Sequence, residues 1–205
     1  MLDIWLELCR RAGISELFIN LHAHADAVRS ALLHRKNGLK VLLFEEQVLL
    51  GSAGTLLLNR DWVASEREFW VLYADVLTTF DLTKMMAFHR RGRPTATIGL
   101  CQVRDPRQCG VAVCDASQIV REFAEKPAVP KSNWVFAGLL IATPELFNVI
   151  PSKSPVDLGF DVFPRLAGRM LGYPISDYLL DVGTMENYQR AQATWPGLSQ
   201  QYSED

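Results

Sequence analysis

The sequence predicts an α/β fold with an open, mixed and mainly parallel sheet. The first observation is that short apolar runs typical of buried strands alternate with stretches whose apolar residues recur at helical spacing. The second is that 49% of the 205 residues are apolar, which is enough for the core of one substantial domain. The third is that no fixed repeat and no low-complexity linker divides the chain. We therefore predict one domain over residues 1–195, followed by a polar tail over 196–205.

The first half of the chain predicts alternating helices and strands. Residues 2–12 place apolar side chains at the spacing of an amphipathic helix that ends at Gly13. The expected strands then lie at 16–21, 39–46, 69–73 and 95–103. The expected helices between them lie at 22–35, 51–62 and 81–91, the last with Asp81 as its N-cap. The first two strands and their helix form a β-α-β unit, which favours parallel pairing.

The second half departs from simple alternation. GVAVC and IVREFAEKP flank the polar turn DASQ and predict a hairpin over 110–127, so the sheet is mixed. A strand at 134–143 leads to a short helix with Pro144 in its first turn, and a helical stretch at 161–170 must accommodate Pro164. The last expected elements are strands at 173–175 and 178–182 and a helix at 185–195.

Composition and charge exclude several functions. The net charge of -2 gives no support to nucleic-acid binding. No apolar run approaches the ~18 residues of a membrane span, and the N-terminus lacks a secretory pattern, so we expect a cytoplasmic protein without a membrane partner. The four cysteines show no C-x-x-C pair, which favours reduced thiols over a zinc site. A small-molecule ligand is the simplest partner, with a homo-oligomer left open.

Polar residues follow three of the expected strands. Asp75 and Asp181 each end an apolar run, and Glu125 with Lys126 ends a third. Because ligands of parallel sheets bind at the carboxyl ends of strands, two such aspartates could share a Mg²⁺ ion and the lysine could face a phosphate. Taken singly, each aspartate could instead cap a turn, and the Glu-Lys pair could be a solvated strand end.

The segment LLGSAGTL places Gly51 and Gly54 three residues apart before a helix. This spacing permits close approach of the backbone to a ligand, but the segment lacks both G-x-G-x-x-G and the Walker lysine. The residues by themselves therefore predict an α/β domain with a phosphate ligand and no particular reaction.

Five blocks of sequence, read in order, point to one family. EEQVLLGSAGTL looks like the motif E-x-x-x-L-G-T-A-G-A-L, and FWVLYADVLTTFDL looks like an apolar strand that ends in G/A-D. GVAVCDASQIVREFAEKP resembles G-V-V-x-x-D…I-x-x-F-x-E-K-P. WVFAGLLIATPELF resembles N-A-G-I-Y-x-x-x-P-E, and YLLDVGTMENYQRA resembles D-I-G-T-P-E-x-Y-x-x-A. From residue 1 to about 195 the chain thus resembles the nucleotide-sugar pyrophosphorylases, or sugar-1-phosphate nucleotidyltransferases.

This resemblance implies a Rossmann-like three-layer sandwich and a set of residue roles. It implies that Asp75 and Asp181 hold the catalytic Mg²⁺ ion. It also implies that Lys126 binds the sugar phosphate and that Glu125 reads sugar hydroxyls. The catalytic residues would then be Asp75, Lys126 and Asp181. The glycines that it places against the substrates are Gly51, Gly54, Gly110 and Gly138.

The implied reaction joins a sugar 1-phosphate to a nucleoside triphosphate and releases pyrophosphate. Both substrates are anions, so a metal ion and a lysine would screen their repulsion and align the attack. A hexose or heptose 1-phosphate is expected, with mannose and GTP as the first choice, in a pathway that supplies polysaccharide or glycoconjugate. The alternative is a binding or regulatory module without catalysis. A nicotinamide-dependent enzyme is disfavoured by the missing G-x-G-x-x-G.

Two departures from the family pattern stand out. Phe136 occupies the position of an asparagine that lies beside the sugar, so one sugar hydrogen bond is lost. The family also begins with a strand and a G-x-G-x-R loop before the helix with which this chain opens. We therefore expect an N-terminally shortened form with weak or no activity, and open strand edges where a central strand is missing. None of His22, His24, His34 and His89 is expected to be catalytic, and all four are expected to favour solvent, whereas Trp5, Trp70 and Trp134 are expected to pack in the core or an interface.

Overall fold

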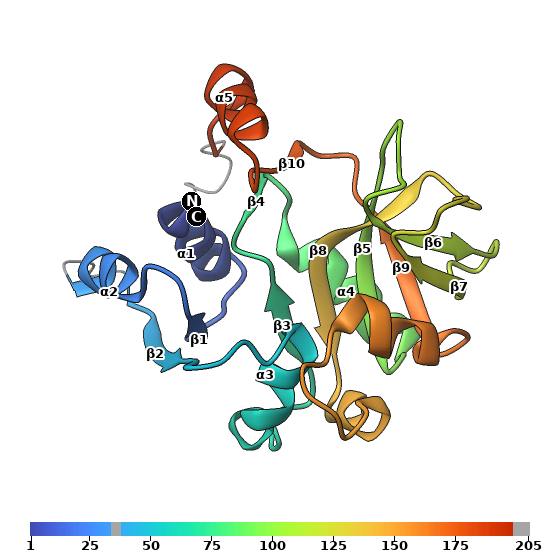
Figure 1. Cartoon of the computed structure of the whole chain (residues 1–205), viewed down its shortest axis with the longest axis horizontal. Coiled ribbons are helices and arrows are strands. Elements are labelled where there is room, and N and C mark those ends of the chain that lie inside the picture. The colour runs from blue at the N-terminus through green and yellow to red at the C-terminus, as the bar shows by residue number, and fades with distance from the viewer. Residues whose placement is uncertain (34–37, 199–205) are drawn as a thin grey trace.

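The computed structural model describes residues 1–33 and 38–198 (Figure 1). The helices are α1 (Leu2–Arg11), α2 (Ala25–Leu33), α3 (Ser52–Leu58), α4 (Leu82–Gly92) and α5 (Met185–Thr194). The strands of the first half are β1 (Glu16–Leu21), β2 (Lys40–Glu45), β3 (Phe69–Leu72), β4 (Val76–Thr78) and β5 (Ala96–Gln102). Those of the second half are β6 (Gly110–Cys114), β7 (Val120–Glu125), β8 (Trp134–Ala142), β9 (Met170–Pro174) and β10 (Leu179–Asp181). Short helical turns lie at Arg60–Trp62, Pro144–Val149, Leu158–Val162 and Phe163–Leu166.

The largest sheet has six strands in the order β7-β6-β8-β5-β9, with β3 beside β8. The central strand β8 runs antiparallel to β3, β5 and β6, whereas β9 runs parallel to β5. Strands β3, β5, β6 and β9 therefore share one direction, and β7 and β8 oppose it. The predicted mixed α/β sheet is confirmed.

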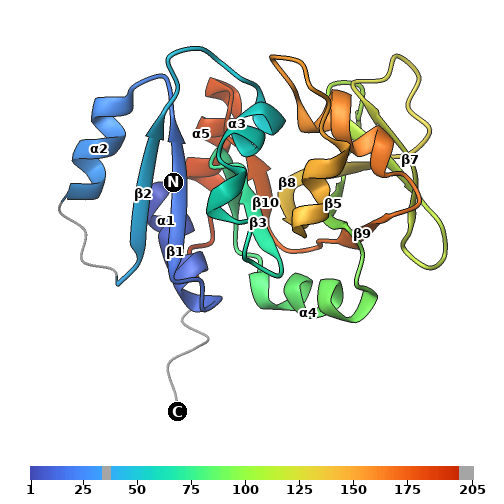
Figure 2. The ribbon, with the colours of Figure 1, turned by 90° about the horizontal axis from the view of Figure 1, so that it is seen from below.

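Helical segments cover both faces of this sheet. Side chains alternate along β8, so this strand presents apolar residues to each face. Ala137, Leu139 and Ile141 face a core that also contains residues of α1 and α4. Leu140 and Ala142 face a second core that contains residues of α3 and of the turns over 158–166. Figure 2 shows α4 below the sheet and the orange segment of residues 158–166 above it. The predicted three-layer sandwich is confirmed.

Strands β1 and β2 form a separate parallel pair. The Ser15 carbonyl accepts from the Lys40 N–H, and the Leu21 carbonyl accepts from the Glu46 N–H. Odd-numbered residues of β1 therefore bond to β2, and the even-numbered Phe18 turns its backbone groups to the opposite edge.

Strand β3 likewise bonds to β8 along one edge only. The Tyr73 N–H donates to the Gly138 carbonyl at 2.9 Å, so Trp70 and Leu72 turn their backbone groups away from β8. Within residues 1–33 and 38–198, no backbone hydrogen bond joins β1 to β3. Both strands thus present an open backbone edge (Figure 2).

Most predicted elements form, and the exceptions have physical reasons. The helical stretch expected at 161–170 lies instead over 158–166, because Pro164 must sit in the first turn of a helix and β9 begins at Met170. The three-residue strand β4 was not predicted, since it is too short to show a period. The helix expected over 22–35 begins at Ala25, and residues 34–35 lie outside the described residues. Residues 199–205 of the predicted tail lie outside them as well.

The predicted caps, thiols and solvent-facing histidines can be checked directly. The Asp81 carboxylate caps α4 by accepting from the Thr83 N–H, as predicted. All four cysteines are free, also as predicted. His22 and His24 are exposed, but the expectation for His89 is wrong, because it is 2% exposed and its Nδ1 lies 2.8 Å from Thr97 Oγ1. A histidine on the inner face of α4 is buried where a hydroxyl can satisfy its ring. His34 lies outside the described residues.

Trp5 is buried, and its Nε1 donates to the Val76 carbonyl at 2.9 Å. This bond ties α1 to β4 and satisfies the only polar atom of the indole ring. None of the described helices is long and apolar enough to cross a bilayer.

Candidate active site

Asp75 and Asp181 are brought together by the short antiparallel pair of β4 and β10. Asp181 pairs with Val76, and the Val182 N–H donates to the Asp75 carbonyl at 2.8 Å. An ideal Cβ on Gly183 would lie 3.0 Å from Asp181 Oδ1 and 3.9 Å from Asp75 Oδ2. The two carboxylate oxygens are therefore at most about 7 Å apart, although 106 positions separate the residues in the chain.

The charges of this pair favour a bound cation. Burial of its carboxylate raises the pKa of Asp75, and the negative charge of Asp181 raises it further. One oxygen of Asp181 accepts from the Gly183 N–H at 2.7 Å, so the turn-capping interpretation also holds for this residue. Among the described residues no three His, Cys, Asp or Glu side chains form a metal cluster. Two carboxylates still fit Mg²⁺, which completes its shell with water and substrate phosphates.

The hairpin of β6 and β7 positions Glu125 and Lys126. Glu125 pairs with Gly110, and the Lys126 N–H donates to the Cys109 carbonyl at 3.0 Å. Lys126 has a left-handed φ of 48° and is exposed. This conformation ends the strand and turns the chain away from the ladder.

The thiol of Cys109 lies within reach of charges from both pairs. Burial raises its pKa, and the charges of Glu125 and Asp181 raise it further, whereas the Lys126 charge lowers it. The charges of three predicted site residues thus act on the pKa of this one thiol. Sequence analysis did not select Cys109, and its position directly before Gly110 was the only available signal.

Glu125 is enclosed by two glycines. A Cβ on Gly110 would lie 2.6 Å from Glu125 Oε2, and a Cβ on Gly159 would lie 2.2 Å from the same atom. A larger residue at either position would push the Glu125 carboxylate out of this place. Burial, and then the charge of Asp157, raises the pKa of Glu125.

The loop with Gly51 and Gly54 packs against Val156. The Ala53 and Gly54 N–H groups both donate to the Val156 carbonyl, at 3.0 and 3.1 Å. Gly51 has a φ of 79°, and a Cβ there would lie 2.3 Å from that carbonyl oxygen. The structure thus assigns these glycines a packing role, and contact with a nucleotide remains a prediction.

Glu46 matches the first residue of the glycine-loop motif, and its side chain holds the loop in place through hydrogen bonds. It is 5% exposed, and it accepts from the Thr55 hydroxyl and from the Leu50 N–H. These bonds join the beginning of the loop to the first turn of α3.

Gly138 lies under Tyr73 in the middle of β8. Its φ is 76°, and a Cβ there would lie 2.7 Å from Val76 Cγ2 and 3.0 Å from Tyr73 Cβ. Phe136 packs edge-on against the rings of Tyr73 and Phe163, with centroids 5.4 and 5.1 Å away. An apolar ring therefore fills the position where the family pattern has an asparagine.

Tyr73 is a residue that sequence analysis missed. Burial raises the pKa of its hydroxyl to about 12, although a hydrogen bond with Ser52 lowers this pKa. The charges of Asp157, Glu125 and Asp75 also raise it. The Tyr73 hydroxyl therefore lies at Ser52 of the glycine loop, where the charges of these carboxylates reach it. Its place two residues before Asp75 was a signal, whereas nothing in the sequence marked Asp157.

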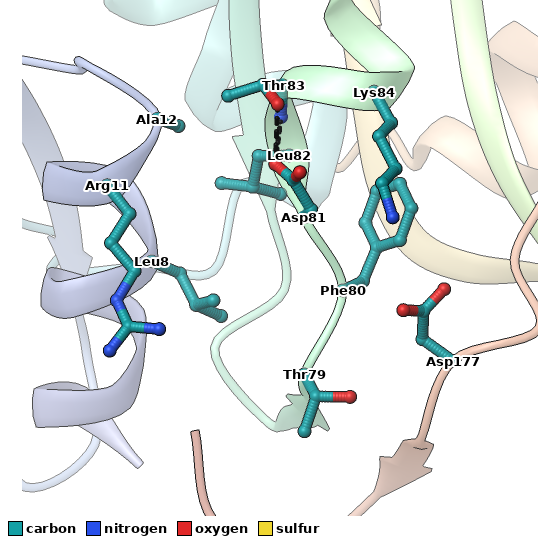
Figure 3. A pocket seen from close by; sticks show the side chains of 10 residues that line it. All are labelled: Leu8, Arg11, Ala12, Thr79, Phe80, Asp81, Leu82, Thr83, Lys84 and Asp177. Atoms are coloured by element: carbon teal, nitrogen blue, oxygen red, sulfur yellow. Dashed lines mark hydrogen bonds between the residues drawn. The ribbon is translucent and has the colours of Figure 1, made fainter. Parts of the chain in front are cut away.

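A cavity of about 210 Å³ lies at the other end of the β4–β10 pair, beyond Thr79 (Figure 3). It is lined by Arg11 and Lys84 but also by Asp81 and Asp177. Asp81 already caps the adjacent helix, and Arg11 pairs with Glu7. The mixed charges and the existing partners give this cavity no preference for an anion.

The fold and the site together define a class of protein. A three-layer sandwich that brings two aspartates, a lysine, a glutamate and a glycine loop to one region is suited to binding phosphate esters and a divalent cation. The chain belongs to the nucleotidyl transferase family, whose sequence model matches residues 1–196.

Curated relatives agree with this assignment, and a solved structure shares the fold. The chain is 29% identical over 189 residues to "Mannose-1-phosphate guanylyltransferase catalytic subunit beta" of Dictyostelium discoideum, covering 89% of this chain and 52% of that protein. It is 26% identical to the protein of the same name from Xenopus tropicalis, with the same coverage. A UDP-glucose pyrophosphorylase crystallised with UDP-glucose superimposes with a TM-score of 0.80 at 16% identity, over 94% of this chain and 84% of that one. The chain thus spans about half the length of the curated relatives that it matches.

Proposed function

We propose that this chain is the nucleotidyltransferase domain of an enzyme that joins a sugar 1-phosphate to a nucleoside triphosphate. The observation that carries this proposal is the convergence of Asp75 and Asp181 on one point beside Gly183. A carboxylate pair from two distant segments fits a divalent cation that two phosphate groups share. Family membership over residues 1–196 supports the same reaction.

The proposed reaction forms one P–O bond and breaks another. An oxygen of the sugar phosphate attacks the α-phosphorus of the nucleotide, and the bond between the α-phosphorus and its bridging oxygen breaks as pyrophosphate leaves. Lys126 binds the attacking phosphate and offsets its charge, and Glu125 accepts hydrogen bonds from sugar hydroxyls. Asp75 and Asp181 would hold Mg²⁺, which supplies charge stabilisation at the reacting phosphates.

We propose mannose 1-phosphate and GTP as the substrates. The support is the identity of 26% and 29% to proteins named mannose-1-phosphate guanylyltransferases. Phe136 removes one polar group beside the proposed sugar position, so the remaining contacts, above all Glu125, would carry more of the sugar recognition.

We further propose that residues 1–205 by themselves turn over slowly. The open edges of β1 and β3 leave the sheet divided close to the glycine loop, which weakens the alignment that the reaction needs. The same open edges favour the second candidate function, a module that binds nucleotide-sugar without making it.

Pyrophosphate release from GTP and mannose 1-phosphate, with and without Mg²⁺, tests these proposals. We expect slow, Mg²⁺-dependent release that the D181N variant lacks and the D177N variant retains. Asp177 is a matched control because it lies near the opposite end of the same strand pair. Binding of GDP-mannose without any turnover would favour the binding module, and rapid turnover would refute the proposed impairment. Equal rates for D181N and the wild type would refute the metal-binding role.

A further inference from the structure

The segment Val156–Gly159 contacts both halves of the proposed site. On one side the Val156 N–H donates to the Leu50 carbonyl at 2.8 Å, and the Val156 carbonyl accepts the two loop bonds from Ala53 and Gly54. On the other side Gly159 lies directly against the Glu125 carboxylate. The segment is therefore the physical connection between the glycine loop and the residue proposed to read the sugar.

Two side chains complete this connection. The Ser52 hydroxyl donates to Asp157 Oδ2 at 2.7 Å and accepts from the Leu158 N–H at 2.8 Å. The other carboxylate oxygen of Asp157 accepts from the Gly159 and Phe160 N–H groups, at 2.8 and 3.0 Å. One carboxylate thus bonds to the loop with one oxygen and to the turn beside Glu125 with the other.

The contacts on both sides are close, and the one at Gly51 is against rigid backbone. A Cβ on Gly51 would be 2.3 Å from the Val156 carbonyl oxygen, and a Cβ on Gly159 would be 2.2 Å from Glu125 Oε2. Val156 and Gly159 are buried, and Ser52 and Asp157 are half-buried, so water competes weakly for these bonds. A shift of the loop would therefore move the turn beside Glu125.

We propose that Ser52 and Asp157 are a positioning pair that fixes the distance between the nucleotide half and the sugar half of the site. This inference rests on the proposed function. Two substrates that must meet in line lose rate steeply when one is misplaced, so a fixed distance between their binding segments has a direct chemical use. Both side chains are held by protein partners, so the pair would act through the loop and through the turn beside Glu125.

The test compares one ligand that spans both halves with ligands that occupy one half. Titration calorimetry would measure the affinities of GDP-mannose, of GMP and of mannose 1-phosphate for the wild type, S52A, D157N and S52T. In S52A and D157N we expect GDP-mannose to bind about five- to tenfold more weakly, as for one lost hydrogen bond of ordinary strength, because both ends must fit at once. GMP and mannose 1-phosphate should change less than twofold. S52T keeps the hydroxyl and should bind like the wild type.

Controls separate positioning from general destabilisation. D161N removes a carboxylate next to this segment, but its amide oxygen can still accept from the Asp157 N–H. It should therefore leave the ratio of the affinities unchanged. The S52A/D157N double variant should lose no more than either single variant. If S52A binds GDP-mannose as the wild type does, or loses all three ligands equally, the positioning proposal is refuted. A wild-type chain that binds none of the three ligands would refute the proposed function itself.

Discussion

Replacing Asp75 by asparagine should stabilise the protein without metal and abolish its response to metal. Asp75 and Asp181 are two like charges held near one point, and nothing in the described residues shows a third carboxylate, histidine or cysteine that would complete a metal cluster with them. In the absence of a cation this arrangement costs stability. In the presence of Mg²⁺ the same arrangement gains it, because the ion binds the folded state only.

The magnitude follows from the separation of the two charges. At the upper limit of about 7 Å, two unit charges repel by about 0.6 kcal/mol in water and by about 2.4 kcal/mol at an effective dielectric of about 20, and a shorter separation would raise both values. Both residues keep much of their surface in solvent, although the Asp75 carboxylate is partly desolvated, and salt screens the pair, so we expect D75N to gain about 0.5–1 kcal/mol at pH 7. For a domain of this size the melting temperature should rise by about 1–4 °C.

The pH dependence gives an independent check of the sign. Burial and the charge of Asp181 raise the pKa of Asp75 above its ordinary value of 3.8. The folded state therefore binds the Asp75 proton more tightly than the unfolded state, and wild-type stability falls as pH rises through the folded pKa. The advantage of D75N should be present at pH 7 and should disappear below about pH 4.

Thermal unfolding of the wild type and D75N at both pH values, with and without Mg²⁺, would measure these effects. D61N is the matched control, because the Asp61 side chain is 98% exposed. It should change neither the stability nor the Mg²⁺ response. A D75N variant that is less stable than the wild type at neutral pH would refute the like-charge reasoning, and one that Mg²⁺ still stabilises would refute the metal role of Asp75.

Three further predictions concern other parts of the molecule. K126A should raise the KM for sugar 1-phosphate at least tenfold more than that for the nucleotide, and equal effects in steady-state kinetics would place the lysine elsewhere. G51A should destabilise the protein by about 2–4 kcal/mol, because its Cβ would meet the Val156 carbonyl oxygen at 2.3 Å. G13A, where φ is 72° and the space is open, should cost only about 1 kcal/mol of backbone strain. Urea unfolding would compare the two variants, and similar losses of stability would contradict the steric reasoning. Burial lowers the pKa of His89, so the unfolded state takes up the proton first as pH falls. The stability of the wild type should therefore drop by about 0.5–1 kcal/mol between pH 7.5 and 5.5. A similar drop in H89Q would show that another group causes it.

Patterns local in the sequence predicted local structure well. Strands β1, β2, β5 and β8 and helices α1, α4 and α5 lie close to their expected positions, because each has a strong period, a cap or a terminating glycine. The turn that begins at Leu158 was misplaced, because its N-cap, Asp157, is set by contact with Ser52, 105 residues earlier. His89 was misassigned for the same reason, since Thr97 accounts for its burial.

The sequence by itself determined the α/β class, the family and the residues that end the strands. Those properties depend on the order and spacing of residues that are neighbours in the chain, and this information can be read directly from the sequence. The tertiary structure alone decided that Asp75 and Asp181 meet and that the glycine loop rests on Val156. It also decided that Tyr73 and Asp157 join the site. Such contacts depend on which distant strands pair and in what register, and no local pattern records that choice.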